Sequence, residues 1–202
     1  MIRAISHWAT AAMAAVAGTA LVYLLLAFLP LADLWAARDP GPHREALAAA
    51  LRIGGWGLLF ALAVTTAVAT AGWAARARSN LVAFGLRSRR LARGRTAVLV
   101  WLLWGSAFAG AGAALLGLIA GLDDREEIAD VRGRVAAGHP IDHDLAAHLF
   151  GRQLVLGLPS AALFVLAAAV AVLLIGRVTG VQCGRIARLR AALAVAGGTI
   201  GA

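Results

Sequence analysis

The chain has 202 residues, of which 61% are hydrophobic, and it carries a formal net charge of +9 at pH 7. That much apolar surface excludes an ordinary water-soluble domain of this length. The positive charge does not indicate a nucleic-acid partner, because an excess of arginine on one side is what orients a membrane protein. Cys183 is the single cysteine, so the chain forms no internal disulfide and offers no cysteine-based metal site.

Four apolar stretches, at about residues 8–31, 53–75, 97–122 and 154–175, contain no Asp, Glu, Lys, Arg or His. Each is long enough to cross about 30 Å of hydrocarbon as a helix. The predicted fold class is therefore all-α: residues 1–202 form one integral membrane domain, a four-span transmembrane helical bundle. The first stretch exceeds the roughly 7–15 residues of a signal-peptide core, so we expect an uncleaved helix.

The charges of the connections segregate along the chain. All ten acidic residues fall in the first connection and in the third, residues 123–151, whereas residues 76–95 and the tail 177–202 contain arginines and no acid. Arginine-rich connections stay in the cytoplasm. We therefore predict a multi-pass protein of the bacterial plasma membrane, with both termini cytoplasmic and residues 123–151 outside. The bacterial source is suggested by the abundance of Arg, Ala and Gly, which is typical of a GC-rich genome.

The connection at residues 76–95 is the most basic part of the chain. Leucine, valine and phenylalanine alternate with its arginines, a pattern typical of a short helix at the membrane surface. The arginines are explained as topology determinants, and they also suit anionic lipid head groups, to which each contributes about 1 kcal/mol. The seven arginines are Arg76, Arg78, Arg87, Arg89, Arg90, Arg93 and Arg95.

Small residues recur every four positions in the third apolar stretch. Such a stripe allows two helix backbones to approach closely, which favours association in a membrane. Packing within the bundle is the main interpretation. A contact between copies of the chain and an accident of the Ala- and Gly-rich composition are the alternatives. The stripe consists of Gly105, Ala109, Ala113, Gly117 and Gly121.

The third connection is predicted to be acidic and partly helical. Residues 123–127 read as a helix start with acids in the first turn, residues 138–140 break that helix, and Asp142 caps a second short helix through Phe150. Three histidines lie here and could bind metal or sense pH. A solvated loop is the favoured interpretation, because Pro140 separates the first two and no known ligand spacing occurs. The histidines are His139, His143 and His148.

The polar groups inside the apolar stretches are hydroxyls of Ser, Thr and Tyr23. Hydroxyls without a neighbouring base are poor catalysts, and those of Ser and Thr in membrane helices usually bond to their own backbone. The chain also lacks a P-loop and a dinucleotide-binding fingerprint. We therefore expect no enzymatic activity, no cofactor and no resident metal.

Two segments at the basic side carry a resemblance to a known family. Residues 71–85 contain a Trp-x-x-Arg-x-Arg-x-Asn pattern, and residues 175–185 contain Arg, Thr, Gln and Arg at matching positions. The chain resembles domain-of-unknown-function family 4328, small multi-pass proteins found mainly in actinobacteria. It departs from that family at residues 98–107, which lack the usual Pro and Asn. The pattern residues are Trp73, Arg76, Arg78 and Asn80, then Arg177, Thr179, Gln182 and Arg185.

The resemblance implies a bacterial membrane protein and no particular activity. Both segments would face the cytoplasm, where Asn80 and Gln182 can each donate and accept a hydrogen bond. We expect them to form a contact between the second and fourth helices, surrounded by arginines.

Together these observations predict a non-catalytic anchor, scaffold or accessory subunit whose basic cytoplasmic face binds anionic lipid or a protein partner. A homo-oligomer is compatible with the small-residue stripe. The alternative is a small transporter or channel component. Its substrate would be uncharged or hydrophobic, because ion-coupled transport relies on charged groups within the membrane and the four apolar stretches contain none.

Overall fold

The computed structural model describes residues 5–83, 95–122 and 124–198, and all its regular elements in these ranges are α-helices. Four helical segments are long and apolar enough to cross a membrane, which confirms the predicted all-α class and indicates an integral membrane protein. The helices are α1 (Ser6–Leu26), α2 (Leu29–Arg38), α3 (Pro42–Ala83), α4 (Arg95–Ala120), α5 (Arg125–Ala137) and α6 (His143–Gly198).

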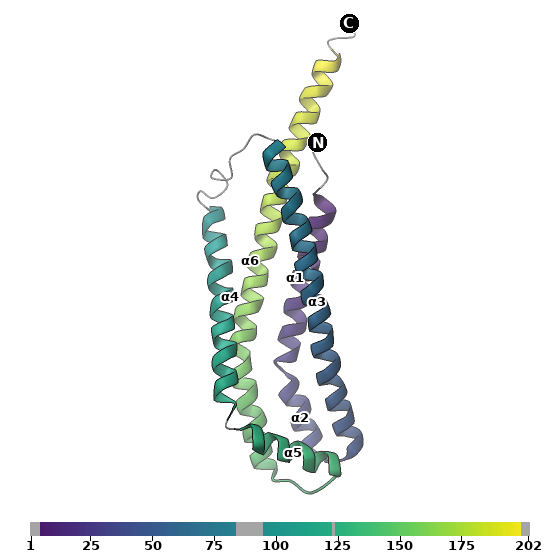
Figure 1. Cartoon of the computed structure of the whole chain (residues 1–202), viewed down its shortest axis with the longest axis vertical. Coiled ribbons are helices and arrows are strands. Elements are labelled where there is room, and N and C mark those ends of the chain that lie inside the picture. Colours follow the sequence, from purple (N-terminus) through teal and green to yellow (C-terminus); the bar gives the residue numbers. More distant parts are fainter. Residues whose placement is uncertain (1–4, 84–94, 123, 199–202) are drawn as a thin grey trace.

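The spanning helices form an open array (Figure 1). Helix α4 packs on α6, α6 packs on α1, and α1 packs on α3. Helices α3 and α4 thus occupy the two edges and do not pack along each other over their described lengths. We call the end where α1 begins and α6 ends the basic end, and the end that carries α5 the acidic end.

Proline divides the first span into two helices. Pro30 has no N–H, and its ring would clash with the carbonyl of Leu26, four residues earlier, so α1 ends at Leu26 and α2 begins at Leu29. The amide of Ala27 still donates to the carbonyl of Tyr23 at 3.2 Å. The helical region therefore extends beyond the apolar stretch at residues 8–31, because α2 continues to Arg38.

The first and third connections are largely helical. Helix α3 begins at Pro42, a residue preorganised for a first helical turn, and α6 begins at His143 and continues without interruption through Gly151. Asp142 caps α6 as predicted, since its carboxylate accepts hydrogen bonds from the amides of Asp144 and Leu145 at 2.9 and 3.2 Å. The separate short helix ending at Phe150 does not exist, because a lone glycine does not stop a helix.

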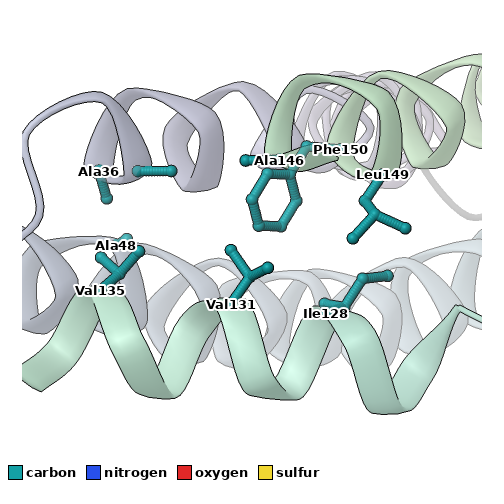
Figure 2. Packing of buried hydrophobic residues seen from close by; sticks show 9 residues of the cluster. Ala36, Ala48, Ile128, Val131, Val135, Ala146, Leu149 and Phe150 are labelled. Carbon is teal, nitrogen blue, oxygen red and sulfur yellow. The ribbon is translucent and has the colours of Figure 1, made fainter. Parts of the chain in front are cut away.

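Helix α5 lies across the acidic end of the bundle. Its apolar residues Ile128, Val131 and Val135 follow helical spacing and point at the ends of α2, α3 and α6 (Figure 2). Gly138, at φ 70°, ends the helix in the left-handed conformation that suits glycine. The third connection is therefore a packed element with its own small core, whose other members are Ala36, Ala37, Ala48, Ala146, Leu149 and Phe150.

Candidate functional site

At the basic end, Asn80 of α3 and Gln182 of α6 are buried and in contact. The Asn80 amide nitrogen donates to the Gln182 side-chain oxygen at 3.4 Å, and the Gln182 amide nitrogen donates to the carbonyl of Ala77 at 3.1 Å. Two turns deeper, the Trp73 indole donates to the Thr179 hydroxyl at 3.1 Å. These bonds join α3 to α6, as expected from the two sequence segments.

The arginines near this contact divide into two groups. The guanidinium of Arg76 stacks over the ring of Trp8 at 5.0 Å, a cation–π contact that ties α3 to α1. The side chains of Arg78, Arg177 and Arg185 are exposed. The predicted loop arginines Arg87, Arg89, Arg90 and Arg93 lie outside the described residues.

The small-residue stripe is only partly the packing face of α4. A Cβ at Gly117 would lie 3.1 Å from the carbonyl oxygen of Leu156, so α4 and α6 are in close contact there. Ala113 and Gly121 are half-buried. Gly105 and Ala109, however, are exposed, and this part of the prediction is wrong.

The helical repeat explains this error. Four residues overshoot a turn of 3.6 by about 40°, so five positions spaced by four drift by about 160° around a straight helix. Near Gly105 and Ala109, which face away from the bundle, the buried residues of α4 are instead Ser106 and Gly110.

The three histidines of the third connection are dispersed on the surface. His139, His143 and His148 are all exposed, and Asp142 serves as the helix cap. Among the described residues, no group of three or more His, Cys, Asp or Glu side chains is placed to hold a metal ion.

The acidic end contains a charge network that the sequence analysis missed. The carboxylate of Asp33, with its side chain 3% exposed, accepts hydrogen bonds at 2.6 Å from both Arg52 and Arg132. Arg52 also donates to Glu45 at 2.9 Å. The network joins α2, α3 and α5. A separate pair, Arg152 and Asp124 at 2.9 Å, joins α6 to the start of α5.

A signal for these pairs was present in the sequence. Asp33 follows the first apolar stretch and Arg52 precedes the second, so both border the membrane at the same level. Asp124 likewise follows the third apolar stretch, and Arg152 precedes the fourth. Opposite charges at equal depth on neighbouring spans therefore predict pairing.

Next to this network lies a cavity of about 700 Å³. One wall contains the break between α1 and α2, with Leu26 and Pro30, and another contains Gly117 and Leu118 of α4. Arg52, Arg125 and Arg132 line it together with Asp33. Deeper in the span, Tyr23 and Ser160 also line it, and their hydroxyl groups are 3.3 Å apart.

The two hydroxyl groups in the cavity lining are engaged with each other and with the helix backbone. The Ser160 hydroxyl donates to the carbonyl of Gly157 at 2.8 Å, so it is engaged with the helix backbone and with Tyr23. Neither partner is a base that could activate it. The walls combine apolar side chains with guanidinium groups at one end, which suits an amphiphilic molecule.

Comparison with known proteins identifies no relative: no protein-family model, curated protein or solved structure matches this chain. The resemblance to family 4328 therefore stays a prediction.

Proposed function

We propose that the protein is a non-catalytic integral membrane scaffold or accessory subunit, whose basic end faces the cytoplasm and binds anionic lipid or a protein partner. The observation that carries this proposal is the extension of α6 beyond the bundle (Figure 1). The 56 residues of α6 extend about 84 Å at 1.5 Å per residue, far more than the roughly 30 Å needed to cross hydrocarbon.

The extension together with its base alongside α3, residues 177–198, has the properties of a binding element. Arg177, Arg185 and Arg188 are exposed on it, and so are the apolar residues Val181 and Leu189. The buried contact between Asn80 and Gln182 fixes its base against α3. A helix held in this way presents its surface without the ordering cost that an isolated segment would incur on binding.

The charge balance of this side supports an external partner. None of the ten acidic residues belongs to residues 76–95 or 177–202. The exposed arginines therefore have no carboxylate of this side of the chain to pair with, which suits binding to phospholipid head groups or to another protein.

A photo-crosslinking amino acid at Leu189 tests the proposal in native membranes. We expect adducts with one protein, or phospholipid adducts enriched in anionic lipid relative to those formed at the exposed, span-located Leu116, which contacts the acyl chains of bulk lipid. Replacing Arg177, Arg185 and Arg188 with Gln should weaken binding of the extension to lipid or protein by up to roughly 150-fold at low salt, since each arginine contributes about 1 kcal/mol. Adducts that persist unchanged in this variant would contradict the proposal.

A second function, as a transport or channel component for an uncharged or hydrophobic substrate, is favoured by one observation. The broken first span lines the cavity, and interrupted helices at membrane depth occur where they face a cavity or are buried in protein. In reconstituted vesicles, efflux of a lipophilic dye should exceed that of protein-free vesicles. Equal rates would exclude this function for that class of substrate.

A further inference from the structure

The cavity at the acidic end has an uneven distribution of charge. Its lining contains three arginines, Arg52, Arg125 and Arg132, and one carboxylate, Asp33. Asp33 is already shared between Arg52 and Arg132, and Glu45 adds a second bond to Arg52. Arg125 makes no ion pair with another described residue. The charged end of the cavity is therefore cationic and complementary to an anion.

Arg132 supplies a second indication of a missing acceptor. Its Nε atom is buried and has no hydrogen-bond partner among the described residues, while its terminal nitrogen donates to Asp33. A buried, unsatisfied donor costs about 1–3 kcal/mol, and more when the group is charged. Because this atom has almost no accessible surface, an acceptor in the cavity would reach it only after a shift of the Arg132 side chain.

Apart from Tyr23, Gln153 and Ser160, the rest of the cavity lining is apolar, and the cavity reaches the surface of the bundle. Trp56 of α3 and Leu118 of α4 line it while remaining 56% and 54% exposed. Because α3 and α4 are the edges of the open array, the cavity opens between them. The arginines border the apolar stretches, at the depth of head groups, and Tyr23 and Ser160 lie within the hydrocarbon level.

We propose that this cavity binds one membrane phospholipid with an anionic head group. The phosphate lies at Arg125 and Arg132, and one acyl chain lies along Leu118, Leu156 and Gly157. The volume of about 700 Å³ is within the roughly 300–1,000 Å³ typical of small-ligand sites. The site is at the opposite end of the bundle from the α6 extension, so it stands independently of the proposed scaffold function.

Two substitutions test the two halves of the site. Arg125→Gln removes a cation that is outside the Asp33 network, and Arg134→Gln is its exposed control on the same helix. Gly157→Leu fills the apolar part, where a Cβ would meet no atom within 4 Å, and Gly112→Leu is its control, equally unobstructed but outside the cavity.

The measurement is retention of lipid by the purified full chain in neutral detergent, counted by native mass spectrometry. The probes are phosphatidylglycerol, phosphatidylcholine with the same acyl chains, and glycerol phosphate. We expect one phosphatidylglycerol per chain, held about fivefold more tightly than phosphatidylcholine, a ratio equivalent to about 1 kcal/mol. Arg125→Gln should abolish the preference, Gly157→Leu should abolish retention, and both controls should behave as wild type.

Three results would overturn the proposal. Equal retention of phosphatidylglycerol and phosphatidylcholine would show that the site does not recognise an anionic head group. Binding of glycerol phosphate as tight as that of phosphatidylglycerol would show that the acyl chain does not contribute to binding. Retention unchanged in Gly157→Leu would place the lipid elsewhere; if that variant does not fold, the lipid preference of Arg125→Gln decides.

Discussion

Asp33 is the residue whose change should most weaken the acidic end of the bundle. Its buried carboxylate is the common acceptor for two guanidinium groups whose side chains are 21% and 32% exposed. Asp33→Asn keeps the size of the side chain and removes its charge. Arg52 then retains Glu45, but Arg132 loses the one carboxylate within ion-pair distance among the described residues.

Breaking a buried ion pair on one side costs about 3–5 kcal/mol, because the remaining charge stays desolvated. Both arginines keep some contact with solvent, so we expect the lower end, about 3 kcal/mol, which corresponds to a change of roughly 150-fold in the unfolding equilibrium. The matched control is Asp130→Asn, which removes an exposed pair with Arg134 on α5. Such a pair contributes only about 0.3–0.5 kcal/mol.

The free energy of unfolding is measured by titrating purified protein from neutral detergent into sodium dodecyl sulfate and following tryptophan fluorescence. Hydrogen exchange at the amides of α5 identifies where the stability is lost. A loss for Asp33→Asn no larger than that for Asp130→Asn would refute the assignment of Asp33 as the link between α2, α3 and α5.

Two further substitutions test packing and buried polarity in the same unfolding assay. Gly117→Leu should lower the free energy of unfolding by about 1–3 kcal/mol, since its side chain meets the backbone of α6. Gly112→Leu, whose side chain meets no atom, should be near neutral. Equal losses of stability for the two variants would show that α4 and α6 are not in close contact. Asn80→Ala should cost about 1–3 kcal/mol, because Gln182 loses a partner at a buried site. Ser79→Ala, an exposed neighbour bonded to its own helix, should change stability by less than about 0.5 kcal/mol, and similar losses for the two would contradict a role for the buried contact.

The spans were predictable from the sequence because a membrane imposes a local rule. A long run without charge must be helical and must cross, and no distant contact alters that requirement. The contact of Asn80 with Gln182 was predictable from the sequence for a related reason. Two polar residues at the basic ends of separate spans lie at the same depth, and a buried amide needs a partner there.

The acidic end was not predictable to the same degree, because its structure depends on pairs far apart in the chain. Asp33 and Arg132 are 99 positions apart, and only the placement of α5 across the bundle brings them together. The cavity likewise arises from the break at Pro30 and from the open edge between α3 and α4. The wrong prediction that Gly105 and Ala109 pack within the bundle was avoidable from the sequence, because the angular drift of a four-residue repeat around a helix can be calculated beforehand.

A scaffold with a basic cytoplasmic face requires the α6 extension to lie on the cytoplasmic side of the membrane. Cys183 is exposed on that extension and is the only cysteine of the chain. A membrane-impermeant maleimide should label it in inverted vesicles and not in right-side-out vesicles. In a Cys183→Ser background, Gly133→Cys on the surface of α5 should give the reverse pattern. Labelling of Cys183 in intact right-side-out vesicles would contradict the orientation and the proposed function with it.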